Sequence, residues 1–428
     1  MNDLILMEHE ASEVIRELKK HGYEAYYVGG YVRDKFLKRT IKDIDITTSA
    51  YPSIVMDLFS HTIPTGLQHG TVTVVMEQFH FEVTTYRTEN EYVDHRRPKE
   101  VQFVNKLIDD LERRDFTMNA MAIDIHGKII DPFGGKKDLN SKILRCVGDP
   151  LLRFSEDALR MMRAIRFAAE YDLQVEQNTW NAILLHREAI KHIAMERIYA
   201  ELDRVMEGSN TKKGIQLLID SELMNNTKEN LHIQKSNWSA FSGHNVLNSF
   251  QSIHEGTIKW ILLLLMLKIE TNQIKPLLKK LKFPNQKIMK IYAVKQVINW
   301  LNEQTYSEKS WKEAVIIYGM DALKDLRTLL NALDHSYLSW LLLKMNEEEL
   351  EIIQQKGMDW IEEIPIKHLR ELEISGNDIV NLKQKSGPWI RIVLNQLLTE
   401  VALNELENKQ KDLINRAAQI VRGMNEYE

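Results

Sequence analysis

Two aspartates separated by a single residue have an arrangement that can hold a metal ion. Asp43 and Asp45 alternate with Ile44 and Ile46, and alternation of polar and apolar residues predicts a β-strand. Successive side chains of a strand point to opposite faces, so both carboxylates would project from one face while the isoleucines enter the core. Adjacent carboxylates repel each other. Mg²⁺, which takes one or two carboxylates together with phosphate oxygens, would remove that repulsion and supply the chemistry of phosphoryl transfer.

A glycine pair and an arginine precede these aspartates. Gly29 and Gly30 follow a predicted strand at residues 26–28 and come before a predicted helix at residues 31–37, which carries Arg33 in its first turn. Glycine lets the backbone approach a phosphate, helix N-terminal amides favour anions, and arginine adds charge-assisted hydrogen bonds. Each feature alone is compatible with solvent-facing acids and an ordinary strand–turn–helix. Together they favour a nucleoside triphosphate site.

Four charged residues recur at intervals of three further along the chain, at Asp157, Arg160, Arg163 and Arg166. Ser155, followed by two acids, predicts the N-cap of the helix that carries them. Because each residue advances a helix by about 100°, the four side chains would follow a spiral. Such a spiral is either a solvated face with i, i+3 ion pairs or a surface that follows an extended nucleotide.

Asp157 and Arg160 together could select a base. Cytosine and adenine both present an exocyclic amine donor beside a ring-nitrogen acceptor, whereas uracil and guanine reverse both positions. Aspartate only accepts and arginine only donates hydrogen bonds, so the pair would hold C or A and mismatch U and G. Each buried unsatisfied group costs about 1–3 kcal/mol, so two mismatches would discriminate strongly.

Turn-forming residues concentrate in the first third of the chain. Nine of the 18 glycines and five of the nine prolines lie in residues 1–150, as expected where strands alternate with helices. Two β-hairpins are predicted, and Glu82 in the first of them is either a third acid of the site or a solvent-facing residue. The hairpins cover residues 70–76 with 79–86 and residues 122–125 with 128–130.

Beyond Pro150 the pattern is helical, and predicted helices cover residues 195–207, 260–268, 287–301 and 392–406. We therefore expect an α+β protein. A head with a mixed or antiparallel β-sheet and helices would be followed by an elongated all-α remainder.

Composition excludes several classes of protein. The net charge of −5 does not support a general affinity for nucleic acid. Residues 271–302 nevertheless carry seven lysines and no acid, which indicates either a solvated helix face or a surface that follows phosphates. The single cysteine, Cys146, excludes an intrachain disulfide. The N-terminus lacks the basic start of a signal peptide, and the longest aliphatic run, residues 261–267, is too short to span a membrane. We expect a cytoplasmic protein.

The motifs in this order resemble a known family. They are similar to the class II tRNA nucleotidyltransferases, the CCA-adding enzymes of the nucleotidyltransferase and poly(A) polymerase superfamily, and the resemblance spans nearly the whole chain. The matching segments are Gly29-Gly30 with Val32-Arg33-Asp34, Asp43-Ile44-Asp45, residues 64–72, residues 113–122, residues 153–160, and residues 374–379 with 387–390.

The resemblance implies a template-independent addition of C, C and A to the 3′ end of tRNA from CTP and ATP by two-metal nucleotidyl transfer. It assigns Mg²⁺ binding and catalysis to Asp43 and Asp45. It assigns nucleotide contacts to Gly30, Arg33, Arg114, Asp157, Arg160, Arg163 and Arg166. Considered without the family, Arg114 would more simply pair with Asp110 or Asp115.

The resemblance also implies four domains, and a monomer or a homodimer. These are a catalytic head at residues 1–148, a neck at 149–207 that recognises the base, a body at 208–302 and a tRNA-binding tail at 303–428. The polar segment at residues 87–103 corresponds to a flexible loop that takes part in the change from C to A addition. Because this loop is intact, we expect complete CCA synthesis.

Other activities remain open from the sequence. A poly(A) polymerase would carry an arginine-rich segment where this chain has residues 64–74, and a CC-only or A-only tRNA nucleotidyltransferase is the next alternative. A catalytically inactive RNA-binding module is disfavoured because both Asp43 and Asp45 are present. Lys279, Lys280 and Lys282 are candidates for contacts with tRNA phosphates.

Overall fold

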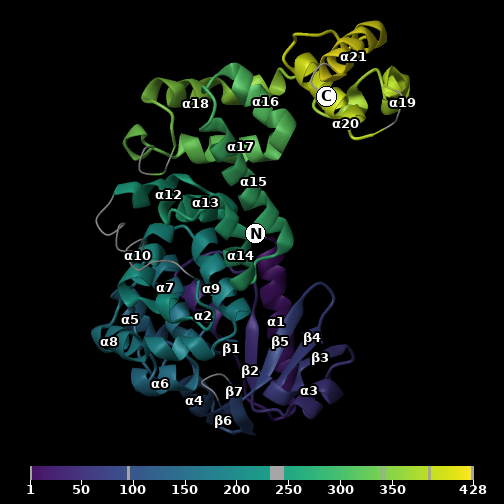
Figure 1. The fold of residues 1–428 in the computed structure, drawn as a ribbon. Helices are drawn as coiled ribbons and strands as arrows, with labels where there is room; N and C mark the ends of the chain where they lie inside the picture. Colours follow the sequence, from purple (N-terminus) through teal and green to yellow (C-terminus); the bar gives the residue numbers. More distant parts are fainter. Residues whose placement is uncertain are drawn as a thin grey trace. The chain divides into compact units, whose positions relative to one another are not determined.

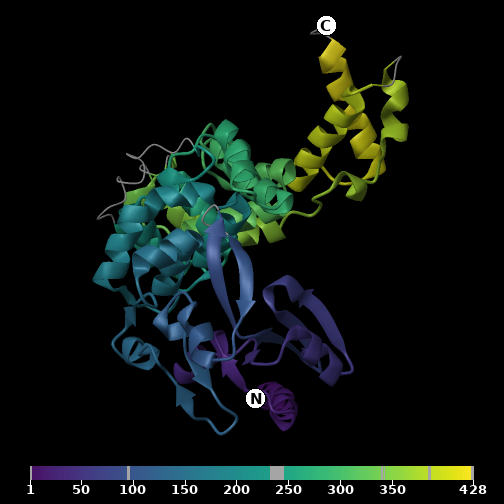
Figure 2. The ribbon, with the colours of Figure 1, turned by 90° about the horizontal axis from the view of Figure 1, so that it is seen from below.

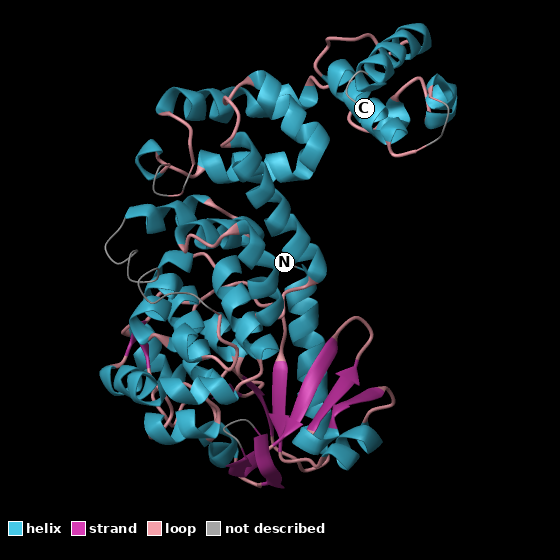
Figure 3. Ribbon diagram, viewed as in Figure 1, coloured by secondary structure: helices cyan, strands magenta, loops and turns pink. Residues whose placement is uncertain are grey.

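The computed structural model describes residues 2–93, 97–231, 245–338, 341, 343–383 and 387–425 (Figure 1). The chain divides into two compact units, Met1–Leu231 and His232–Glu428. Within the described residues every β-strand belongs to the first unit (Figure 3). The predicted α+β class, a sheet-containing head followed by helices, is therefore confirmed. The finer domain boundaries after residues 148, 207 and 302 stay predictions.

Seven strands of the first unit form one mixed sheet in the order β3-β4-β5-β2-β1-β8-β9. β2 and β5 are parallel, and the other neighbours are antiparallel. The strands are β1 (Ala25–Val28), β2 (Asp45–Thr48), β3 (Thr62–Gly66), β4 (Thr71–Val75), β5 (His80–Thr85), β8 (Ala122–Ile123) and β9 (Ile129–Ile130). β4 with β5 and β8 with β9 are the two predicted hairpins.

The alternation that predicted β2 is present, but the strand is shorter than expected. Ile44 and Ile46 are 2% and 0% exposed, so they point into the core as predicted. β2 begins only at Asp45, which pairs with Val28, the last residue of β1. Asp43 therefore precedes the strand by two residues.

Strand β3 was not predicted from the sequence. Its five residues include Pro64 and Gly66, which are poor strand formers. These two residues are tolerated because β3 lies at the edge of the sheet and pairs with β4 alone. The pairing is irregular between Ile63 and Gly66.

Helices surround this sheet. In α1 (Asn2–Lys20) Ala11, Val14, Ile15 and Leu18 are all fully buried, as expected from their spacing of three and four residues. The shorter helices are α2 (Gly30–Phe36), α3 (Pro52–Leu58), α4 (Leu107–Glu112) and α5 (Gly135–Asn140). Further helices of the unit are α8 (Gln177–His186), α9 (Met195–Glu207) and α10 (Thr211–Ser221), and β10 (Ile143–Leu144) and β11 (Gln174–Val175) form a short strand pair.

The predicted helix start at Ser155 is wrong. Ser155 lies in the last turn of α6 (Pro150–Glu156), which begins earlier because the Asp149 side chain accepts a hydrogen bond from the amide of Leu151 and Pro150 occupies the first helical position. The chain is extended at Asp157, and α7 (Leu159–Glu170) begins two residues later. Asp157 therefore lies in a break between two helices, and its Oδ1 accepts from the amide of Leu159 at 3.0 Å.

The segment expected to be a flexible loop contains regular structure. β6 (Arg87–Val93) and β7 (Arg97–Phe103) form a separate antiparallel ribbon (Figure 2). Residues 94–96 at its tip lie outside the described residues.

The second unit contains helices α12 to α21. The predicted helices at residues 260–268, 287–301 and 392–406 correspond to α13, α15 and α20. The described helices are α12 (Ser249–Ser252), α13 (Gly256–Met266), α14 (Thr271–Lys280), α15 (Asn285–Leu301), α16 (Glu308–Tyr318), α17 (Met320–Asn331), α18 (Glu347–Glu362), α19 (Gly376–Ile379), α20 (Trp389–Ala402) and α21 (Gln410–Asn425).

The longest aliphatic run of the sequence is buried in the core of the second unit. Ile261, Leu264 and Leu267 are each at most 4% exposed. In the part of the chain that the structure describes, no helix is long and apolar enough to cross a membrane.

Candidate active site

Charged residues from distant parts of the first unit line one pocket of about 440 Å³. Seven arginines and three aspartates contribute to its wall, an excess of four positive charges. The wall consists of Gly29, Gly30, Arg33, Asp45, Arg87, Arg113, Arg114, Asp115, Asn119, Asp157, Leu159, Arg160, Arg163, Phe167 and Arg197. Such a concave, strongly positive surface suits a polyanion such as a triphosphate.

The end of β1 and the start of β2 place Asp45 beside the predicted glycine turn. Gly29 has a φ of 68°, in the left-handed region that favours glycine. A Cβ atom on Gly29 would lie 3.3 Å from Oδ2 of Asp45 and 3.5 Å from Nη1 of Arg114. The residue therefore has to be small as well as flexible, because a carboxylate and a guanidinium approach its backbone closely.

Three carboxylates gather around this end of the sheet. Glu82 is the neighbour of Asp45 in the adjacent parallel strand and is exposed, and Asp43 is also exposed. Burial, followed by the charges of Asp43 and Glu82, raises the pKa of Asp45 to about 6, against the lowering effect of Arg114 and Arg33.

These acids fit a divalent metal ion only if another molecule supplies further oxygens. The repulsion at Asp45 is of the kind that a cation would relieve. Among the described residues no group of three acidic, histidine or cysteine side chains is arranged to hold a metal ion. Asp43 and Asp45 would therefore need phosphate oxygens of a bound nucleotide to complete the coordination, as is usual for Mg²⁺.

Arg114 and its neighbour Arg113 share one buried carboxylate. Asp110 is fully buried and accepts from Nη2 of Arg113 at 2.7 Å and from Nη2 of Arg114 at 3.3 Å. Burial would raise the pKa of Asp110, but the two arginines lower it. The pairing with Asp110 that the sequence suggested is thus present. It does not exclude a ligand, because Arg114 also forms part of the pocket wall.

Arg33 is held on three sides. Asp34 accepts from its Nε and Nη2 at 3.0 and 2.9 Å, and Asn119 Oδ1 accepts from its Nη1 at 2.7 Å. The guanidinium also lies 4.4 Å from the ring centroid of Tyr171. Its position at the pocket wall is therefore fixed by contacts from α2, from the segment after α4 and from the end of α7.

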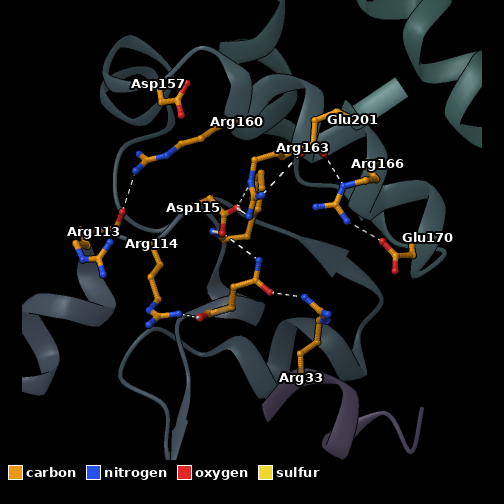
Figure 4. Close-up of polar contacts among 12 residues, drawn as sticks. Arg33, Arg113, Arg114, Asp115, Asp157, Arg160, Arg163, Arg166, Glu170 and Glu201 are labelled. Atoms are coloured by element: carbon orange, nitrogen blue, oxygen red, sulfur yellow. Dashed lines mark hydrogen bonds and ion pairs between the residues drawn. The ribbon is translucent and has the colours of Figure 1, made fainter. Parts of the chain in front are cut away.

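Arg163 is fixed by Asp115, and Figure 4 shows the two side chains pointing toward each other. Nε and Nη2 of Arg163 donate to Oδ2 of Asp115 at 2.8 and 2.6 Å. Burial would raise the pKa of Asp115, but Arg163 and Asn119 hold it at about 2. The carboxylate therefore stays ionised and orients Arg163 at the wall.

The predicted base-reading pair also lies in the wall, and each member has its own support. Asp157 accepts from Nη2 of Arg197 at 2.8 Å. Nη1 of Arg160 donates to Oε2 of Glu156 at 2.6 Å, and its Nη2 donates to the carbonyl oxygen of Arg113 at 2.9 Å. The break between α6 and α7 thus directs an acceptor-only group and a donor-only group into the same pocket.

Arg166 is not part of this wall. Its Nε donates to Glu201 at 2.5 Å, its Nη1 donates to Glu170 at 2.9 Å, and the guanidinium packs 3.9 Å from the centroid of Phe167 (Figure 4). The six residues from Arg160 to Arg166 make about 1.7 helical turns, and the side chain of Arg166 faces Glu201 on α9. The pocket therefore unites Gly30, Arg33, Asp45, Arg114, Asp157, Arg160 and Arg163, with Asp43 close by.

Several residues of the wall were missed by sequence reasoning. Asn119 lies in the matched segment after Arg113, but nothing in its local pattern indicates a role. Arg197 is 40 residues from Asp157, which it contacts, and sits in an ordinary amphipathic helix. Arg87 begins the ribbon and donates to the carbonyl oxygen of His69. None carries a periodic signal that could have identified it.

Three family models match parts of the chain. Residues 25–145 match the Poly A polymerase head domain, residues 172–232 match an RNA and SrmB- binding site of polymerase A, and residues 251–417 match the tRNA nucleotidyltransferase domain 2.

Individual relatives match over nearly the full length. A CCA-adding enzyme of Geobacillus sp. (strain WCH70) is 37% identical over 97% of this chain and 98% of its own. A CCA-adding enzyme of Bacillus velezensis is 34% identical over 94% of this chain and 96% of its own.

A solved structure has the same fold. The Bacillus stearothermophilus CCA-adding enzyme in complex with CTP has a TM-score of 0.81 at 30% identity and covers 98% of this chain and 99% of its own. The full-length matches, together with the charged pocket and the strand-end aspartates, show the family. The chain belongs to the CCA-adding enzymes, a family of tRNA nucleotidyltransferases.

Proposed function

We propose that this protein adds C, C and A to the 3′ end of tRNA, without a nucleic-acid template, from CTP and ATP. The 3′-oxygen of the tRNA would form a bond to the α-phosphorus of the nucleotide, and the bond to the β-phosphate would break to release pyrophosphate. The observation that carries the proposal is the single pocket that contains Asp45, the arginines and the Asp157 and Arg160 pair. A cytoplasmic location belongs to the same proposal.

The arginines would bind the triphosphate. Arg33, Arg114 and Arg163 each hold a fixed orientation through a carboxylate, namely Asp34, Asp110 and Asp115. Because these groups are ordered before the nucleotide arrives, little reorganisation is needed when charge develops on the phosphates.

Enzymes of this family generally use a divalent metal ion, and we propose Mg²⁺ held by Asp43 and Asp45. When bound, it would neutralise charge on the phosphate oxygens and the attacking oxygen. The raised pKa of Asp45 supports this assignment, because a carboxylate crowded by Asp43 and Glu82 gains most from a cation.

Asp157 and Arg160 would read the base. Asp157 can accept from the exocyclic amine of C or A, and Arg160 can donate to the adjacent ring nitrogen. Both residues line the pocket. Glu156 supports Arg160 and Arg197 supports Asp157, so both side chains have a defined orientation toward a bound base.

The second unit would contribute to tRNA binding. Lys279 and Lys282 are exposed and Lys280 is partly exposed on and just after α14. We propose that these lysines contact phosphates of the tRNA backbone, which is the main source of affinity in non-sequence-specific recognition.

The purified protein incubated with tRNA that lacks its terminal C, C and A, and with each nucleotide in turn, tests the function. We expect CTP alone to give two additions and CTP with ATP to give three, with no addition from UTP or GTP. A long A tail would instead indicate a poly(A) polymerase, and an arrest after two C residues would indicate a CC-adding enzyme.

A further inference from the structure

Asn119 occupies a central position among the arginines of the pocket. It is the last residue of a short 3₁₀ helix, Thr117–Asn119, and is 7% exposed. Its Oδ1 accepts from Arg33 Nη1 at 2.7 Å, and its Nδ2 donates to Asp115 Oδ1 at 3.0 Å. Its backbone oxygen accepts from Arg114 Nη1 at 3.4 Å. One residue therefore contacts two arginines directly and a third through a carboxylate.

The third arginine is Arg163. Asp115 accepts a hydrogen bond from Asn119 on Oδ1 and from Arg163 on Oδ2. A continuous chain of hydrogen bonds therefore runs from Arg33 through Asn119 and Asp115 to Arg163. Figure 4 shows the two ends of this chain, with Arg33 below and Arg163 above. The two arginines come from α2 and α7, which are 130 residues apart at these positions.

The chemistry of both neighbours determines which side chain fits between them. Arginine only donates and ionised aspartate only accepts, so the linking group must accept on one side and donate on the other. The carboxamide of asparagine does both at this length. A carboxylate of the same shape would face Asp115 with a like charge, and an apolar side chain would leave Arg33 Nη1 and Asp115 Oδ1 without this partner.

We propose that Asn119 is a positioning residue that sets the spacing of Arg33 and Arg163 for the phosphates of the incoming nucleotide. It acts equally on CTP and ATP and takes no part in the choice of base, because Asp157 and Arg160 are supported by other residues. This inference rests on the proposed nucleotide-binding function of the pocket and adds to it a residue that controls phosphate affinity.

Asn119→Asp and Asn119→Leu test the inference, with Asn181→Asp as a matched control. Asn181 is an exposed residue of α8, and its Oδ1 accepts a hydrogen bond from Nε2 of Gln177 at 2.8 Å. We expect both Asn119 variants to raise KM for CTP and for ATP by about tenfold, with an unchanged CTP to ATP ratio and continued rejection of UTP. A purely structural role would instead lower kcat together with the folded fraction and leave KM unchanged.

Direct binding of inorganic tripolyphosphate separates this inference from the proposed function. The probe has no base and needs no turnover, so its Kd can be measured by calorimetry even if the wild-type protein added no nucleotide. We expect a rise of about tenfold in Kd in each Asn119 variant that remains folded by circular dichroism, and no change in Asn181→Asp. An unchanged Kd in the folded Asn119 variants, or a KM effect on only one nucleotide, would overturn the inference.

Discussion

The arginines of the pocket are each held by an acid or a carbonyl oxygen behind them. Asp34 holds Arg33, Asp110 holds Arg114, and Asp115 holds Arg163. Each acid reduces the local positive charge but fixes the direction of a planar guanidinium, whose remaining donors can then face a ligand. The lining carries seven arginines against three aspartates, and with Asp34 and Asp110 behind it two positive charges remain in excess, so the pocket stays attractive to a triphosphate.

At the residue scale, Asp45→Asn should abolish nucleotide addition while stabilising the metal-free protein. The loss of a metal ligand should reduce kcat by more than about a thousandfold. Because the folded protein raises the pKa of Asp45 from 3.8 to about 6, its charged form is unfavourable in the fold above pH 6. Removing that charge should increase the free energy of unfolding at pH 7 by roughly 3 kcal/mol.

This increase should shrink as the pH falls below 6 and disappear below about pH 3, where the wild-type carboxyl is protonated in both the folded and the unfolded state. Urea unfolding in EDTA at several pH values measures it. Asp57→Asn, at an exposed position of α3, is the control. A destabilised Asp45→Asn protein at pH 7 would show that Asp45 is not crowded by its neighbours.

A second prediction at the residue scale concerns the choice of base. Asp157→Asn replaces an acceptor-only group with an amide that can also donate, so UTP and GTP no longer face a mismatch at this position. We expect the ratio of kcat/KM for CTP over UTP to fall by at least about tenfold. Steady-state kinetics with each nucleotide on tRNA lacking its 3′ end measures the ratio. Unaltered rejection of UTP would argue against a role of Asp157 in reading the base.

At the scale of elements, the break between α6 and α7 organises the site. It directs Asp157 and Arg160 into the pocket, while Arg166, two turns further along α7, faces α9 and is bound by Glu201. The family resemblance groups these residues in one role. The helix geometry separates them, because a three-residue step falls about 60° short of a full turn.

Arg166→Met should therefore affect stability rather than nucleotide affinity. Glu201 is 4% exposed and would lose its 2.5 Å partner, and removal of one member of a buried ion pair costs about 3–5 kcal/mol. Because Arg163 and Arg204 also lie within 4 Å of Glu201, we expect the lower end of that range. Denaturant unfolding measures the loss, and KM for CTP should stay within about twofold. A stable Arg166→Met protein with a strongly raised KM for CTP would instead indicate that Arg166 contacts the nucleotide.

Several elements could be predicted from local sequence and others could not. β2, β4 and β5 follow alternating patterns, and α1 and α9 follow helical spacing, because each buries one continuous face. The start of α6 at Pro150 and strand β3 depend instead on a capping bond and on pairing with β4. The residues that make those contacts show neither a clear helical nor a clear strand pattern. Local spacing therefore predicted the wrong helix start near α6 and did not predict β3.

At the scale of the whole molecule, charge is distributed unevenly. The chain carries a net charge of −5, yet the pocket wall is strongly positive and residues 271–302 contain lysines without acids. Local surfaces therefore govern the interaction with a polyanion, since charges separated by more than about 10 Å are largely screened at 0.1 M salt.

Reversal of Lys279, Lys280 and Lys282 to glutamate should weaken tRNA binding and flatten its dependence on salt. Each lost phosphate contact lowers the slope of log K against log salt by up to about 0.9. A matched control reverses Lys128, Lys136 and Lys137, which are exposed residues of the first unit, and changes the net charge equally, from −5 to −11. Fluorescence anisotropy over a salt series compares the two. Equal effects of both triple variants would assign the change to net charge rather than to this surface.

The fold class, the acidic strand end, the glycine turn and the residue types that can bind a nucleotide were predictable, because they depend on short-range alternation and spacing. Contacts in the folded chain establish which acid holds which arginine, that Arg197 supports Asp157, that Asn119 links Arg33 to Asp115, and that Arg166 turns away. These contacts join residues tens of positions apart. Their partners are selected by the path of the chain and the complementarity of donors with acceptors, neither of which leaves a periodic mark in the sequence.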